Sequence, residues 1–241
     1  MRKYIFLLLS IFASSCQITE TIYLNEDGSG KIQTELHRDE QTYMQLAAEN
    51  YSKEDIFQDT TYVFKDIITK YSETFLRLPA LEQAIFQKFE NVNVHIKKSS
   101  YEKEFRTTIT QNFNTISAVP DLYKTQEYED DLKHNYALSA EEHYYNISYT
   151  FEKNIFKRIV KITDSLELKK QQDKISGLKT RAAHFKINQP YVLKYHFPQK
   201  IKSVSNTNAK ISEDKKSLTL EFLLSDCLQN PESTNLEVIL D

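Results

Sequence analysis

The sequence predicts an α+β fold, in which an antiparallel, hairpin-rich sheet carries amphipathic helices packed on one side. Three observations lead to this fold class. Segments in which apolar and polar residues alternate recur along the chain, as they do in strands with one buried face. Between residues 40 and 90 the apolar residues repeat at helical spacing instead. The composition, with 15 tyrosines, 14 phenylalanines and only three glycines, also favours strands over glycine-rich phosphate-binding loops.

The N-terminal segment has the order of a secretory leader. Arg2 and Lys3 precede an apolar run over residues 4–12, and three small residues then lead to Cys16. With Cys16 directly after the small residues, the segment resembles the lipobox of bacterial lipoproteins. This resemblance implies that residues 1–15 are a lipoprotein signal peptide and that Cys16 is lipidated at the membrane. The apolar run is too short for a bilayer span, which needs about 20 residues. An ordinary signal peptide followed by a chance cysteine is the alternative.

The net charge of the chain argues for and against particular classes of binding partner. The chain carries 31 basic and 34 acidic residues, a net charge of −3. Removal of Arg2 and Lys3 with the leader leaves 29 basic against 34 acidic residues, a net charge of −5. Nucleic-acid-binding domains present a basic surface, so this balance argues against nucleic acid as a partner. We expect a single α+β globular domain over residues 16–241, with 164–183 as the seam if there are two units.

The first expected elements are two strands, over residues 19–24 and 31–37. The turn between them contains Asp27-Gly28, a dipeptide that readily adopts the positive φ angles of tight hairpin turns. Only about three residues separate Cys16 from the first strand, a reach of roughly 10 Å when extended. We therefore expect the folded body to lie against the membrane.

Helices follow, and the alternating pattern then returns and predicts two more hairpins and a strand-rich last third. The predicted helices cover residues 40–50, 63–71, 78–89, 118–135 and 164–183. The predicted strands cover residues 92–96, 105–113, 145–151, 155–162, 191–197, 201–204, 218–224 and 236–240.

Two segments carry a resemblance to a known family. Residues 20–30 read ETIYLNEDGSG shortly after the cysteine motif, and residues 195–206 read YHFPQKIKSVSN. Together they resemble uncharacterised lipoproteins of Bacteroidetes-type bacteria and, more distantly, the LppM-type lipoprotein domain. The resemblance is confined to the two ends of the mature chain. It implies a lipid-anchored envelope protein, and it supplies no catalytic residue.

The resemblance also bears on the cellular address. In proteobacterial lipoproteins an aspartate directly after the lipidated cysteine retains the protein in the inner membrane. In Bacteroidetes-type lipoproteins an acidic cluster there resembles a surface-export tag. The segment Gln17-Ile18-Thr19-Glu20 fits neither pattern. We expect a lipid-anchored protein of the outer membrane, on its periplasmic side, with the cell surface as the alternative.

The sequence holds no catalytic or metal-binding pattern. The six histidines lack zinc-site spacing, and there is no nucleophile elbow, Walker loop or dinucleotide fingerprint. The acidic stretch over residues 127–131 is interpreted as a solvated helix face. Cys227, which stays alone once Cys16 is lipidated, is expected to be a buried, inert thiol. We expect no metal and no cofactor, while a hydrolase assembled from distant residues stays open.

Four tyrosines form the candidate ligand-binding set: Tyr145, Tyr149, Tyr191 and Tyr195. Tyrosine combines a large apolar body with a polar tip, which suits interfaces and ligand grooves. On alternating strands the same residues are also typical of a core face. The leading prediction is a non-enzymatic lipoprotein of binding or structural type, whose partner is an envelope protein or an apolar ligand. A carrier of a hydrophobic ligand in an internal cavity is the second candidate.

Overall fold

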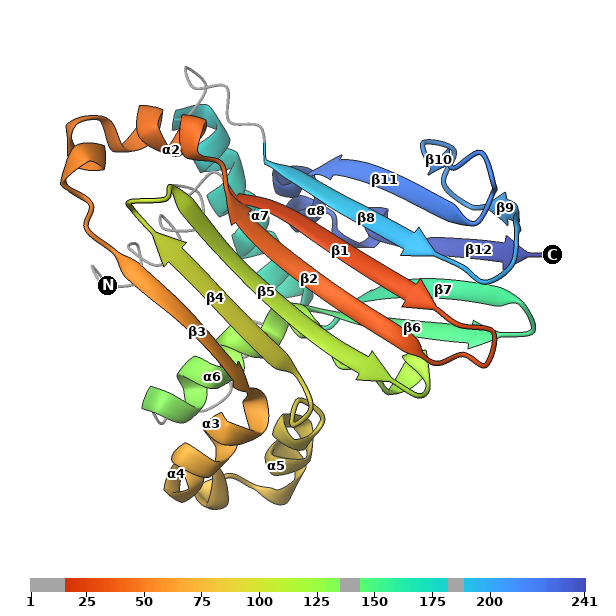
Figure 1. Cartoon of the computed structure of the whole chain (residues 1–241), viewed down its shortest axis with the longest axis horizontal. Helices are drawn as coiled ribbons and strands as arrows, with labels where there is room; N and C mark the ends of the chain where they lie inside the picture. The colour runs from red at the N-terminus through yellow and green to blue at the C-terminus, as the bar shows by residue number, and fades with distance from the viewer. Residues whose placement is uncertain (1–15, 135–143, 182–188) are drawn as a thin grey trace.

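The computed structural model describes residues 16–134, 144–181 and 189–241, so the predicted signal peptide lies outside the described residues. Helices combine with two sheets of mainly antiparallel strands, which confirms the predicted α+β class (Figure 1). The larger sheet has the order β10 (Lys210–Ile211), β11 (Ser217–Leu223), β8 (Pro190–His196), β1 (Cys16–Leu24), β2 (Gly30–Arg38), β5 (Glu104–Phe113), β4 (Asn93–Ser99) and β3 (Phe57–Val63). The smaller sheet has the order β6 (Tyr145–Glu152), β7 (Ile155–Ile162), β12 (Leu236–Leu240) and β9 (Ile201–Val204).

The three predicted hairpins are present as β1–β2, β4–β5 and β6–β7. Gly28 has a φ of +81° in the first turn, and Lys153 and Asn154 have φ angles of 50° and 62° in the third. Such angles suit the tight turns of hairpins. One pairing in the larger sheet is parallel: β1 lies beside β8, which brings the C-terminal third of the chain against the N-terminal hairpin.

The larger sheet buries one face. Ile22, Ile32, Ile109 and Val94 lie on this face along neighbouring strands and are almost completely buried. The smaller sheet covers the half of this face formed by β11, β8 and β1, and helices cover the half formed by β5, β4 and β3 (Figure 1). No helix or second sheet of the described part lies over the opposite face, which is mainly polar.

Short helices occupy the connections between strands. Those over the larger sheet are α3 (Phe64–Lys70), α4 (Ser72–Arg77), α5 (Ala80–Gln87) and α6 (Thr125–His134). Helix α2 (Glu40–Ala47) and the 3₁₀ turn η1 (Ala48–Lys53) lie at the end of the sheet where β1 begins (Figure 1). The remaining turns are η2 (Ile116–Ala118), η3 (Leu122–Lys124) and η4 (Pro231–Thr234), and the remaining helices are α7 (Ser165–Arg181) and α8 (Leu224–Gln229).

The longest helix, α7, fills most of the region predicted to be helical over 164–183. Asp164 caps its N-terminus, because its carboxylate accepts the backbone N–H groups of Leu166 and Glu167 at 2.9 Å each. The side chain of Lys179 contacts Asp226 of α8 at 2.7 Å. The possible seam at this helix stays a prediction. None of the helices within the described residues is long and apolar enough to cross a bilayer.

Strands β1 and β3 are among the elements that differ from the sequence prediction. Strand β1 begins at Cys16 itself rather than at Thr19, because Cys16 is the register partner of Arg38 on β2. Strand β3 was not predicted, because most of it lies between the predicted helices over residues 40–50 and 63–71. Its side chains are mostly exposed, so this edge strand lacks the alternation of buried and exposed residues that marks a strand in sequence.

Candidate functional site

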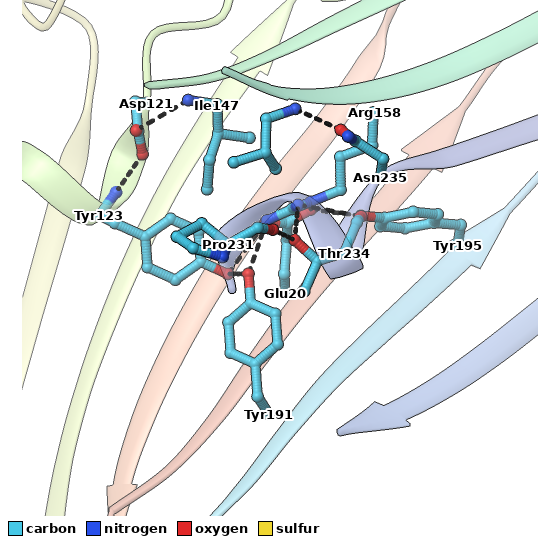
Figure 2. Close-up of polar contacts among 11 residues, drawn as sticks. Glu20, Asp121, Tyr123, Ile147, Arg158, Tyr191, Tyr195, Pro231, Thr234 and Asn235 are labelled. Carbon is cyan, nitrogen blue, oxygen red and sulfur yellow. Dashed lines mark hydrogen bonds and ion pairs between the residues drawn. The ribbon is translucent and has the colours of Figure 1, made fainter. Parts of the chain in front are cut away.

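A buried ion pair joins the two sheets. Glu20 on β1 and Arg158 on β7 both have fully buried side chains, and their Oε1 and Nε atoms lie 3.3 Å apart (Figure 2). Glu20 occupies an inward position of β1, in step with Ile22 and Leu24. Arg158 occupies the corresponding inward position of β7, between Phe156 and Val160. The two charged groups therefore meet where apolar contacts are expected.

Every N–H donor of the Arg158 guanidinium has an acceptor within the protein. Nε and one terminal nitrogen donate to Glu20, at 3.3 and 3.5 Å, and that same terminal nitrogen donates to the Tyr191 hydroxyl at 2.6 Å. The other terminal nitrogen donates to the carbonyl oxygen and the hydroxyl of Thr234, at 3.2 and 2.7 Å. A guanidinium has five N–H donors, so none is left for a ligand. Full pairing of this kind is what makes a buried charge tolerable.

Two tyrosines complete the surroundings of the carboxylate. Tyr195 donates its hydroxyl to Glu20 Oε1 at 2.5 Å, and Tyr123 donates to Oε2 at 2.9 Å. The Tyr191 hydroxyl, which accepts from Arg158, donates in turn to the Tyr123 hydroxyl at 2.9 Å. Burial is the main reason why the pKa values of all three phenols lie above their ordinary value. The phenols therefore stay neutral and act as hydrogen-bond donors at physiological pH.

A second buried carboxylate lies beside this cluster. Asp121, directly before η3, accepts the backbone N–H groups of Tyr123 at 3.2 Å and of Ile147 at 3.1 Å (Figure 2). Burial raises the pKa of Asp121 to about 6, and Lys124, the two N–H groups and Arg158 oppose this rise only in part. The aspartate ties the connection before α6 to strand β6 of the smaller sheet.

The structure places the four predicted tyrosines between the two sheets. Tyr149 and Tyr195 are buried and both pack against the ring of Phe156, at centroid distances of 6.4 and 5.2 Å. Tyr145 and Tyr191 line a small cavity. The ligand-binding role of the four stays a prediction.

The cavity lies between β6, β8 and α8. Its volume is about 20 Å³, whereas a single water molecule needs roughly 10–15 Å³ on the same measure. Its wall includes Tyr145, Arg158, Tyr191 and Cys227. Burial raises the pKa of the Cys227 thiol to about 12, so the thiol stays protonated and a poor nucleophile. Cys227 is buried and free, as expected, but it lies on α8, a helix that the sequence did not predict.

Other titratable groups meet on the surface. His95 on β4 contacts Asp59 on β3, with Nε2 and Oδ1 3.0 Å apart, and both side chains are exposed. Lys97 approaches the same aspartate at 3.5 Å. The hydrogen bond from His95 is the main cause that holds the pKa of Asp59 below its usual range. Within the described ranges, no group of three or more histidine, cysteine, aspartate or glutamate side chains is placed to hold a metal ion.

Sequence reasoning missed the residues at the centre of this site. Glu20, Arg158 and Asp121 were not singled out, although the first two interrupt apolar faces in a strict two-residue alternation. Glu20 shares its face with Ile22, and Arg158 shares its face with Phe156. A charged residue in step with buried apolar neighbours was the available signal for a buried pair.

The comparisons with known proteins give one likeness. The sequence matches no protein-family model and no curated protein. The fold is similar to the NMR structure of the folded domain of Mycobacterium tuberculosis LppM, with a TM-score of 0.39 and 8% sequence identity. The similarity covers 95% of this chain and 92% of that chain. LppM is also the distant resemblance noted in the sequence. A likeness at this level carries no conclusion about function.

Proposed function

We propose that this chain is a lipid-anchored lipoprotein of the cell envelope, of non-enzymatic, binding or structural type, held at the membrane through Cys16. The observation that carries the proposal is the order of residues 1–16, in which a basic pair, a short apolar run and small residues lead to a cysteine. Lipoprotein processing places diacylglycerol on such a cysteine and makes it the first residue of the mature chain.

The start of the fold supports this reading. Strand β1 begins at Cys16, and Cys16 is paired in register with Arg38 of the central strand β2. The expected tether of about three residues is therefore absent, and an acyl chain on this cysteine would leave the sheet directly. Stable anchoring needs more than one acyl chain, which lipoprotein processing supplies. We place the protein on the periplasmic side of the outer membrane, with the cell surface as the alternative.

A structural or binding role is supported by how the buried polar groups are used. The donors of Arg158 and the oxygens of Glu20 are occupied by the protein itself. The exposed pair His95–Asp59 lies on an open strand surface and also contacts Lys97, an arrangement typical of a solvated ion pair. No described observation favours a hydrolase over this reading.

The carrier alternative requires an apolar volume that the cavity at Tyr145 and Tyr191 does not have. At about 20 Å³ it accommodates a water molecule, whereas ligand pockets commonly measure roughly 300–1,000 Å³. A carrier that used this cavity would have to separate the two sheets and expose the Glu20–Arg158 pair. Lipid extraction of the protein purified from native membranes tests this directly, because a carrier must bring an apolar ligand with it in stoichiometric amount.

The two cysteines of the chain make the anchor testable with a matched control. Cys16→Ser should abolish incorporation of labelled palmitate and keep the leader on the protein. Cys227→Ala removes a buried thiol that cannot be acylated in the folded protein, so its palmitate label should equal that of the wild type. Equal labelling of Cys16→Ser and wild type, or an unacylated mature terminus by mass spectrometry, refutes the proposal.

A further inference from the structure

Four exposed apolar side chains gather at one end of the larger sheet. Phe57 is 76% exposed and Tyr101 is 97% exposed, while Met44 and Ile56 are each more than one third exposed. We call these four residues the apolar rim. Met44 lies on α2, Ile56 directly precedes β3, Phe57 is the first residue of β3, and Tyr101 lies in the turn between β4 and β5. Exposed apolar side chains that gather at one place mark a contact surface more often than the same side chains scattered singly.

Backbone contacts hold three of the rim residues together. Ile56 and Ser100 exchange two hydrogen bonds, from the Ser100 N–H to the Ile56 carbonyl at 2.9 Å and from the Ile56 N–H to the Ser100 hydroxyl at 3.0 Å. Phe57 is the register partner of Ser99. Tyr101 directly follows Ser100, so its ring starts from a fixed turn beside Ile56 and Phe57.

The rim is joined to the start of β1 through Arg38, the register partner of Cys16. Arg38 forms two hydrogen bonds with Glu54, at 2.9 and 3.0 Å, and one with Glu40, at 2.5 Å. Its guanidinium also lies 3.8 Å from the ring centroid of Tyr43, the neighbour of Met44. Arg38 thus fixes both α2 and the segment that enters β3 to the strand beside β1.

We propose that the apolar rim inserts into the lipid surface to which Cys16 is anchored, so that the sheet stands with this end on the bilayer. The inference rests on the proposed function, because the lipid anchor at Cys16 is what makes a membrane the surface that the apolar rim contacts. Figure 1 shows α2 and the turn between β4 and β5 at the end where β1 begins, with α4 and α5 at the opposite end. An acyl chain leaving Cys16 holds these exposed side chains within reach of the membrane interface.

The chemistry of the rim fits the interfacial zone of a bilayer. Tyrosine places an apolar ring among acyl chains and its hydroxyl among head groups. Lys103 lies over the ring of Tyr51, at 4.5 Å from its centroid, and extends the same amphipathic character along this end of the sheet. Exposed charges of both signs lie nearby, with Lys53 and Lys103 beside Glu49, Asp55 and Glu102. Insertion is therefore driven by apolar burial, and a zwitterionic membrane suffices.

Tryptophan fluorescence provides the test, because the chain contains no tryptophan. Single variants Phe57→Trp and Tyr101→Trp are made in the full, lipidated protein and reconstituted into phosphatidylcholine vesicles with and without brominated acyl chains. The matched control is Leu81→Trp on α5, at the opposite end of the sheet, where Leu81 is 83% exposed. We expect brominated lipid to quench the two rim variants about twofold, as for side chains 5–10 Å deep in the interface, and to leave the control unchanged.

Flotation of the vesicles separates failure of this inference from failure of the anchor. A protein that floats with the vesicles but shows no quenching at positions 57 and 101 overturns the apolar rim as a lipid contact and leaves the anchor standing. If brominated lipid quenches the Leu81→Trp control as strongly as the rim variants, the protein has no fixed orientation on the membrane. This result also overturns the proposal. If the wild-type protein does not float with the vesicles, the lipid anchor is refuted. The membrane is then also refuted as the surface that the apolar rim contacts. Addition of 0.5 M salt should not reduce quenching of the rim variants.

Discussion

The two halves of the inward face of the larger sheet are covered by different structures with different chemistry. Over β3, β4 and β5, helices bring together the rings of Phe64, Phe86, Phe89 and Tyr128, with centroid distances between 5.0 and 6.5 Å. Over β1 and β8, the smaller sheet brings Arg158 against the Glu20 carboxylate and the Tyr191 hydroxyl, and two further phenols donate to the same carboxylate. One half is an aromatic core, whereas the other contains a buried charge pair.

The two interfaces therefore contribute differently to the stability and the geometry of the fold. An aromatic core gains free energy from buried area and tolerates small rotations between helix and sheet, because apolar contact has little directionality. A buried ion pair adds little net stability, because desolvation opposes the attraction, but it penalises every arrangement that leaves one partner unpaired. We infer that the Glu20–Arg158 pair sets the register between the two sheets, whereas the packing of the aromatic half is stabilised by apolar burial.

The largest effect is expected from Arg158→Met. The substitution keeps most of the side-chain volume but leaves the Glu20 carboxylate buried without a counter-charge. We expect the free energy of unfolding to fall by about 4 kcal/mol, the usual cost of breaking a buried pair from one side. Urea unfolding followed by circular dichroism measures it.

The double variant Glu20→Gln/Arg158→Met sharpens this test. The glutamine oxygen can still accept from the Tyr195 hydroxyl, and no unpaired charge remains. We expect the double variant to be more stable than the sum of the single effects predicts, by about 2 kcal/mol. Additive losses in the double-mutant cycle would show that the two groups do not act as a pair, and the assigned role in sheet register would then fail.

A smaller effect is expected in the aromatic half. Phe86 is 1% exposed and packs against Phe64, Phe75 and Tyr128. Phe86→Ala creates a cavity, and we expect a loss of about 3 kcal/mol, at the lower end for such truncations because short helices can relax into the space. Leu81→Ala, on the exposed side of the same helix, should change the stability by less than about 0.5 kcal/mol. Equal losses for the two would mean that α5 does not pack as described.

The two halves also differ in how far the sequence predicted them. Helical spacing in residues 63–71 and 78–89 predicted the helices of the aromatic half, because amphipathic periodicity is a local property. Periodicity also predicted the hairpins β1–β2 and β6–β7, whose turns contain Asp27-Gly28 and Lys153-Asn154. Both kinds of prediction concern residues close together in the chain.

The polar half depends on contacts between distant residues. Alternation assigns Glu20 and Arg158 to the inward faces of their strands but does not say that these faces meet, since the two residues are 138 positions apart. The parallel pairing of β1 with β8 and the division of the strands into two sheets are equally non-local. Periodicity identifies a buried face but does not say which other face packs against it. For this reason the sequence analysis singled out Tyr195 and missed its hydrogen-bond acceptor, Glu20.

The smallest predicted effect concerns Asp121, which ties the helical side of the molecule to the smaller sheet, and it appears as a dependence on pH. The pKa of about 6 in the folded state lies above the ordinary aspartate value of 3.8, so between these values the folded state binds more protons than the unfolded state. Its contribution to stability is therefore present at low pH and is lost as pH rises, by about 2 kcal/mol between pH 4 and pH 6. The variant Asp121→Asn cannot titrate and loses one of two acceptor contacts, so it should be less stable at pH 4 while lacking this decline. Carboxylates with lowered pKa values, such as Asp59 and Asp214, titrate at lower pH. Their contributions to stability are the same in the wild type and the variant and cancel when the two unfolding free energies are subtracted. Urea titrations at pH 4, 5, 6 and 7 should show the stability advantage of the wild type shrinking steadily, and parallel curves would mean that the aspartate is not buried as described.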